Sequence, residues 1–236
     1  MSYTQPTILI LRGNDEHAVK AYLQSLIDQL GDPAITELNL TRLDGLQASI
    51  EELSNATGAI PFLAARRLVI FTHPLERVRD SQAQERFKMM LDSLPETTLL
   101  VLVVDDQPKY QKGVPLQWSL LNPKHWLIQW AKQAGERVQV LDFALPPSFE
   151  MPAWIQKQAR QMGGQFTRSA AEALASHIGS DTRLASLEIE KLLTYVDFKR
   201  PVEAEDVELL TAARGQASIF DMTDALAQGN LPTAQR

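Results

Sequence analysis

The segment Thr98–Val104, TLLVLVV, is the most apolar run of the chain and decides how its first half folds. An uninterrupted run of leucine and valine is typical of a strand that is buried on both faces, as in a parallel sheet covered by helices. The segments Arg67–Thr72, RLVIFT, and Thr7–Arg12, TILILR, are shorter runs of the same character. All three are therefore expected to be strands of one largely parallel sheet.

Segments with the helical spacing of apolar residues alternate with these strands. Two further strands are expected, at Ile35–Leu40 and at Arg137–Phe143. Helices are expected between the strands at Val19–Leu30, Leu46–Ala56, Ser81–Leu94 and Pro123–Ala134. Five short strands that alternate with helices predict an α/β fold with helices on both faces of the sheet.

The pattern changes at Ala144–Pro152, ALPPSFEMP, which holds three prolines and no periodicity, and a linker is expected there. Only helices follow, at Trp154–Met162, Ser169–Ile178, Leu184–Val196, Ala204–Ala212 and Ile219–Gln228. The chain is therefore expected to hold an α/β domain at residues 1–146 and a small all-α domain at 147–213. Residues 214–236 are expected to begin a further helical domain.

Composition excludes several classes of protein. The chain has 236 residues, no cysteine and four histidines far apart in the sequence, so neither disulfides nor a metal site of cysteine or histidine is expected. A net charge of −6 argues against a protein that coats DNA by itself. No run is long enough to cross a membrane and the first residues lack the pattern of a secretory signal, which predicts a cytoplasmic protein.

A parallel sheet followed by helices suggests a nucleotide-binding protein, but the phosphate-binding loop GxxxxGK[ST] does not occur in the sequence. The turn after the first strand reads Gly13-Asn14-Asp15-Glu16, which places carboxylates where phosphate requires backbone donors and a lysine. Asp105 and Asp106 follow the strand Thr98–Val104 and are either magnesium ligands or polar residues that end a buried strand. An ATP-dependent enzyme with a degenerate phosphate loop therefore remains the alternative from another class.

The segment Gly58–Arg67, GAIPFLAARR, places large apolar residues around a proline between an expected helix and an expected strand. Such a loop either folds its aromatic residue back into the core or exposes the apolar residues to a partner. The sequence leaves both possibilities open. The candidate binding residues are Ile60, Pro61, Phe62, Leu63, Arg66 and Arg67.

In several of its segments the chain resembles the delta subunit of bacterial DNA polymerase III clamp loaders. The turn Gly13–Glu16 is similar to the family's glycine and acidic pair after the first strand. Pro61-Phe62-Leu63 with Arg66–Ile70 resembles its proline, two large apolar residues and basic start of a strand. Further similar segments are Trp154-Ile155, Leu184–Leu192, Asp206-Val207, Ile219-Phe220-Asp221 and Asp224-Ala225-Leu226.

The resemblance implies an AAA+-like α/β domain without a working nucleotide site, a helical lid and the beginning of a collar domain that is cut short here. It implies a subunit that binds and opens the beta sliding clamp so that the clamp can be loaded on primed DNA, without hydrolysing ATP itself. The implied partners are the clamp, through Ile60–Leu63, Arg66 and Arg67, and the gamma/tau and delta-prime subunits, through the missing collar. DNA would be met only indirectly. No cofactor, metal or catalytic residue is implied.

Two points qualify the resemblance. Phe62 and Leu63 stand in the order aromatic then aliphatic, whereas the family often has the reverse, so the residue that dominates binding is left open. A delta-prime subunit is the other loader component to consider, and the lack of its cysteine zinc module argues against it. As a part of the polymerase III holoenzyme, a delta subunit is grouped with DNA-directed DNA polymerases, which are nucleotidyltransferases, although it performs no catalysis.

Overall fold

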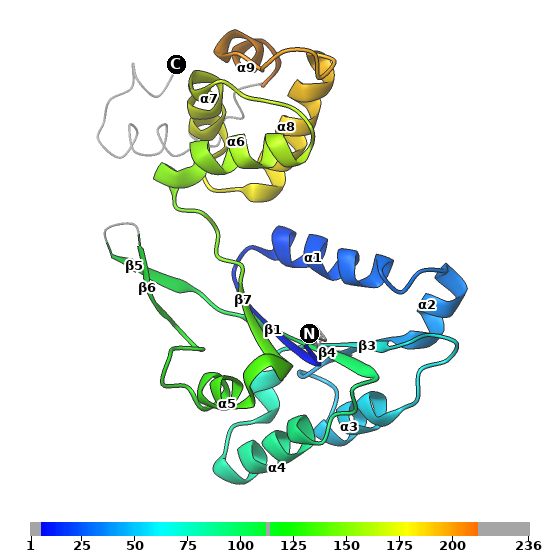
Figure 1. Ribbon diagram of the computed structural model, residues 1–236. Coiled ribbons are helices and arrows are strands. Elements are labelled where there is room, and N and C mark those ends of the chain that lie inside the picture. The colour runs from blue at the N-terminus through cyan, green and yellow to red at the C-terminus, as the bar shows by residue number, and fades with distance from the viewer. Residues whose placement is uncertain (1–5, 112–113, 212–236) are drawn as a thin grey trace. The chain divides into compact units, whose positions relative to one another are not determined.

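The computed structural model describes residues 6–111 and 114–211, and the chain divides into two compact units between Leu145 and Pro146 (Figure 1). This division is next to the limit expected at residue 146. The expected start of a third domain at 214–236, with its helix Ile219–Gln228, lies outside the described residues. Among the residues that the structure describes, no helix is both long and apolar enough to cross a membrane.

The first unit is built on a five-stranded parallel sheet in the order β2-β3-β4-β1-β7. The strands are β1 (Ile8–Gly13), β2 (Leu40–Asp44), β3 (Arg67–Thr72), β4 (Thr98–Asp105) and β7 (Val138–Asp142). Both neighbours of the central strand β4 are parallel to it, and β1 also pairs with β7. The expected α/β fold with a parallel sheet is therefore confirmed.

Helices cover both faces of this sheet (Figure 1). Helix α1 (Glu16–Asp28) packs on one face, while α3 (Ile50–Gly58), α4 (Ser81–Asp92) and α5 (Trp126–Ala134) pack on the other. Leu100 and Leu102 of β4 belong to the core beneath α3, α4 and α5, and Val101 belongs to the core beneath α1. The three side chains are fully buried, as expected for a strand covered on both faces.

The strand expected at Ile35–Leu40 is wrong. Residues Pro33–Asn39 form helix α2, and β2 begins at Leu40. Helix formation here follows from an N-terminal signal, because the Asp32 side chain accepts a hydrogen bond from the Ala34 amide at 2.8 Å and a proline occupies the first helical position.

The sequence reading also missed an antiparallel hairpin formed by β5 (Pro108–Gln111) and β6 (Val114–Trp118). Arg12 of β1 fixes the base of this hairpin. Its guanidinium group lies 4.6 Å from the ring centre of Trp118, donates to the Leu121 carbonyl at 2.6 Å and pairs with Asp142 of β7. The helix expected from Pro123 begins only at Trp126.

The second unit is helical, with α6 (Met151–Gln161), α7 (Arg168–Ile178), α8 (Thr182–Tyr195) and α9 (Ala204–Leu210). The expected linker therefore ends earlier than proposed, because Met151 and Pro152 already belong to α6. The core of this unit is apolar and fully buried, with Met151, Ile155, Leu174, Ile189 and Leu192 among its members.

Arg200 and Asp206 form a two-bond ion pair in the second unit. Asp206 accepts hydrogen bonds from Nη1 and Nη2 of Arg200 at 2.6 and 2.8 Å and from the Glu203 amide at 2.9 Å, at the N-terminus of α9. The bond from Arg200 is the main cause that lowers the pKa of Asp206 to about 2. Because this pKa lies below the ordinary value of an aspartate, the contact stabilises the fold above about pH 4 and loses its effect as pH falls toward 2.

Replacing Asp206 with asparagine is therefore expected to lower the unfolding free energy of the second unit at pH 7 by about 1–2 kcal/mol. The difference from the unmodified chain should shrink between pH 4 and pH 2. Urea unfolding followed by circular dichroism at several pH values measures both effects. Asp197→Asn is the matched control, since Asp197 and its partner Lys199 are exposed, and it should change stability little. A loss that is equal at pH 7 and pH 2.5 would contradict this account.

Candidate functional site

The loop between α3 and β3 exposes three large apolar side chains within four residues. Ile60 is 88% exposed, Phe62 is 56% exposed and Leu63 is 76% exposed, while Pro61 is half-buried. Phe62 thus does not fold back into the core, which was one of the two possibilities that the sequence left open. We call Ile60, Phe62 and Leu63 the apolar loop.

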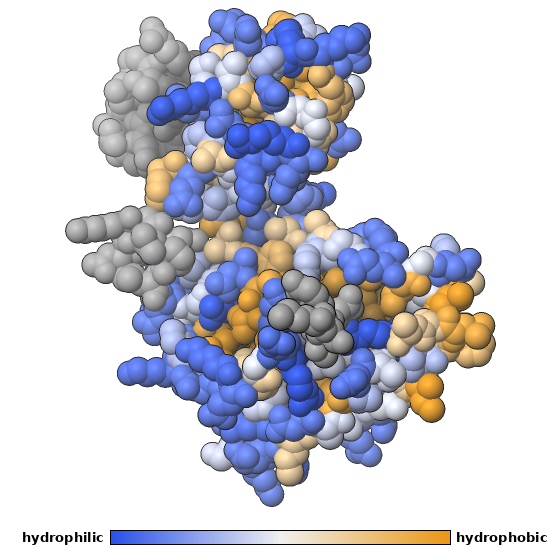
Figure 2. All heavy atoms as spheres, viewed as in Figure 1, coloured by the Kyte–Doolittle hydropathy of each residue, from blue (hydrophilic) through white to orange (hydrophobic). Residues whose placement is uncertain are grey.

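The apolar loop adjoins a shallow hollow beside α1 and α2. Leu26 of α1, Leu30 just after α1, Ile35 of α2 and Leu68 at the start of β3 line this hollow together with Leu63. Figure 2 shows hydrophobic residues gathered over the end of the first unit where Figure 1 places α2. Exposed apolar side chains gathered beside such a hollow indicate an interaction site.

Asn39, the last residue of α2, holds the backbone of this loop. Its side chain is fully buried, accepts a hydrogen bond from the Phe62 amide at 2.7 Å and donates to the Phe62 carbonyl at 2.7 Å. The same amide group also donates to the Ile35 carbonyl at 2.8 Å. The sequence reading missed Asn39, because nothing in its local pattern connects it to a loop more than twenty positions away.

The two arginines after the loop bind the body of the first unit. Arg66 donates to the carbonyl oxygens of Glu96 and Pro6 at 3.1 and 2.9 Å, and burial lowers the pKa of its guanidinium group. Arg67 is 9% exposed and donates to the Thr41 hydroxyl at 2.9 Å. We therefore leave Arg66 and Arg67 out of the contact surface, because both guanidinium groups fasten the start of β3 to its surroundings.

The turn after β1 is filled by the protein's own backbone. A Cβ atom at Gly13, whose φ is +146°, would lie 1.9 Å from the Phe143 carbonyl oxygen. The amide of Asp15 donates to that oxygen at 2.9 Å, and the Asp15 carboxylate accepts from the Ala18 amide at 3.0 Å. Donors that would face a phosphate group in a nucleotide-binding loop are thus already bound within the chain.

Asp106 has a structural role. It is 1% exposed, and its carboxylate accepts hydrogen bonds from the amides of Gln107, Leu120 and Leu121 at 2.7–2.8 Å. These bonds hold the segment that follows the hairpin against the end of β4. Asp105 is exposed, and within the described residues no group of three or more histidine, aspartate or glutamate side chains is placed to hold a metal ion.

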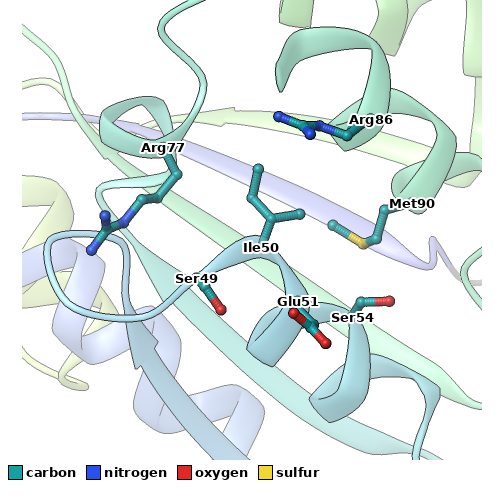
Figure 3. Close-up of a pocket in the computed structure, with 7 residues that line it drawn as sticks. All are labelled: Ser49, Ile50, Glu51, Ser54, Arg77, Arg86 and Met90. Carbon is teal, nitrogen blue, oxygen red and sulfur yellow. The ribbon is translucent and has the colours of Figure 1, made fainter. Parts of the chain in front are cut away.

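A second hollow lies between α3 and α4 on the other face of the sheet (Figure 3). In this view Ile50 lies between Arg77 and Arg86, with Met90 of α4 opposite α3. The hydroxyl group of Ser49 accepts from the Glu52 amide as the N-cap of α3, so it is committed to the helix. The described residues that line this hollow include no histidine beside a nucleophile, and they offer no catalytic pair.

Residues 9–125 match the family model described as DNA polymerase III, delta subunit. This match covers just under half of the chain, and over these residues the chain is similar to the DNA polymerase III delta subunit family. The matched residues contain the apolar loop, Asn39 and the turn Gly13–Asp15 after β1, whereas Phe143, which fills this turn, lies beyond them. The resemblance inferred from the sequence is thus confirmed over residues 9–125.

The fold is similar to that of the Bacillus subtilis DNA clamp loader delta protein, with a TM-score of 0.75 at 16% identity. The match covers 98% of this chain and 66% of that protein, so the chain spans just under two thirds of its length. The Thermotoga maritima RuvB Holliday junction branch migration motor matches at a TM-score of 0.43 and 12% identity, over 92% of this chain and 67% of that one. A search of curated protein sequences gave no match.

The contact at Gly13 gives a direct test of the filled turn. Gly13→Ala is expected to lower the unfolding free energy of the first unit by roughly 1–3 kcal/mol, because the new methyl group meets the backbone of Phe143 and the φ angle favours glycine. Urea denaturation measures the change. Gly58→Ala is the control, since a Cβ there has no atom within 4 Å, and it should leave stability unchanged or slightly higher. Equal stability of the two variants would show that β1 and the segment after β7 are not in close contact.

Proposed function

We propose that this chain is a clamp-loader subunit that binds the bacterial beta sliding clamp and opens it for loading on primed DNA, without hydrolysing ATP itself. The observation that carries the proposal is the apolar loop, in which Ile60, Phe62 and Leu63 stay exposed although apolar side chains normally avoid water. The match of residues 9–125 to the delta subunit family model and the fold shared with a clamp loader delta protein support the choice of partner.

The apolar loop supplies enough binding energy for such a contact. Burying a large apolar side chain contributes about 1.5–3 kcal/mol, and a few such anchors dominate most protein interfaces. Phe62 and Leu63 are adjacent in the chain and belong to one loop beside the sheet, so both can enter one apolar pocket on the clamp. Ile60 and Pro61 complete the contact at its edge.

Binding alone does not open a ring. A ligand shifts an equilibrium only by its difference in affinity for the two states, so this subunit must fit a clamp with a parted interface better than a closed one. A loop fastened to a buried sheet favours this difference, because a stiff surface adapts poorly to the wrong state. The first unit has these properties, since β3 begins four residues after Leu63 and lies beside the central strand β4.

The filled turn after β1 supports the part of the proposal that concerns ATP. The Phe143 carbonyl and the Asp15 carboxylate accept hydrogen bonds from backbone amides that a triphosphate would need. Clamp binding by this subunit is therefore expected to require no nucleotide. We propose that the gamma/tau and delta-prime subunits supply ATP-dependent control in the assembled loader. In the same proposal the protein works in the cytoplasm, meets DNA through the assembled loader and performs no catalysis.

Calorimetric titration of the chain with the beta clamp, in the absence of nucleotide, tests this proposal. The unmodified chain should bind at micromolar concentration or tighter, and Phe62→Ala combined with Leu63→Ala should weaken binding by at least about 100-fold. The melting temperature of this double variant should stay nearly unchanged, because both side chains are exposed.

Met89→Ala is the matched control, because Met89 is 62% exposed on α4, which packs on the face of the sheet opposite α1. This variant should bind the clamp as well as the unmodified chain. A large loss of stability in the double alanine variant would show that the pair belongs to the core, and absence of binding by the folded, unmodified chain would refute the proposed function.

A further inference from the structure

We propose that Asn39 is a positioning residue of the apolar loop. It fixes the backbone of Phe62 and thereby holds Phe62 and Leu63 in the conformation that a protein partner binds. The role of the loop as a clamp contact rests on the proposed function. The role of Asn39 in fixing the loop rests on contacts within this chain alone.

The Asn39 side chain is suited to this role because it both donates and accepts. Its Oδ1 atom accepts from the Phe62 amide and its Nδ2 atom donates to the Phe62 carbonyl, each at 2.7 Å. The peptide groups on both sides of Phe62 are therefore held by one side chain. The second donor of Nδ2 binds the Ile35 carbonyl, which anchors the pair to α2. Neither an aspartate nor an aliphatic residue can make all three bonds.

Leu63 explains why the backbone needs this support. Its φ angle is +50°, in the left-handed region that residues with a side chain avoid. The hydrogen bonds from Asn39 end at Phe62, directly before Leu63, and oppose the return of the loop to an ordinary conformation. A loop that is held in this way before binding loses less conformational freedom when it binds.

Asn39 cannot touch a partner itself, so it acts on binding through the backbone that it holds. Its side chain is fully buried, whereas Phe62 and Leu63 are more than half exposed. Removing the Asn39 amide group thus alters no side chain of the apolar loop. A change in clamp affinity would therefore come from the conformation of the loop.

The test is Asn39→Ala in the full 236-residue chain, titrated with the beta clamp by calorimetry without nucleotide. Loss of the hydrogen bonds leaves the left-handed conformation of Leu63 without support, so binding should weaken about fivefold to thirtyfold. Asp106→Ala is the matched control, because it also removes a buried polar side chain that binds three backbone groups, at a place that does not touch the loop. Both variants should lower the melting temperature, but only Asn39→Ala should weaken clamp binding.

Hydrogen exchange of the Phe62 amide gives a second readout that needs no partner. In the unmodified chain this amide should exchange slowly although its side chain is exposed, and in Asn39→Ala it should exchange at least tenfold faster while the amides of β3 keep their rates. Fast exchange in the unmodified chain would overturn the inference even if the variant does not fold. Equal clamp affinity of the unmodified chain and the Asn39→Ala variant would also overturn it. If the unmodified chain does not bind the clamp, the proposed function fails, and the exchange rate of Phe62 still decides the role of Asn39.

Discussion

Burial of β4 on both faces is the constraint on which the first unit depends. Leu100 and Leu102 close the core beneath α3, α4 and α5, and Val101 closes the core beneath α1, so helices must pack on both sides of the sheet. A strand in this position must have a paired neighbour along each edge, since its unpaired backbone groups could not be hydrated. These neighbours are β1 and β3. Each of them adjoins a feature on which the proposed function rests, namely the filled turn after β1 and the apolar loop before β3.

The apolar loop is connected to this buried sheet at several points. Asn39 binds its backbone where α2 ends and the edge strand β2 begins, and Arg66 and Arg67 fasten the start of β3 to neighbouring segments. The polar residues near the loop thus hold the backbone, and the apolar residues face outward. This division explains how a short loop can keep large apolar side chains exposed in one conformation. It also gives the arginines, which the sequence suggested as contacts, a different physical role.

The sequence predicted the features that follow from burial and left out those that follow from individual hydrogen bonds. The runs at Thr98–Val104 and Arg67–Thr72 were read correctly because continuous apolar strands are common in parallel sheets. The segment Ile35–Leu40 was misread because an Asp-Pro helix start outweighs its apolar spacing. Composition located the apolar loop but could not show whether its side chains face solvent or the core, since the same residues are common in a core. Asn39 and the left-handed Leu63 gave no local signal, because their roles depend on contacts between distant segments.

Clamp opening by a stiff apolar loop is the step on which the proposed function depends, and a comparison of two forms of the clamp tests it. Calorimetry would measure the affinity of the chain for a beta clamp cross-linked shut across its subunit interfaces and for a clamp whose interface is broken by substitution. The account predicts clearly tighter binding to the clamp with the broken interface, because only a difference in affinity can drive opening. Equal affinity for the two forms would contradict it and would leave the chain as a clamp-binding protein that does not open the ring.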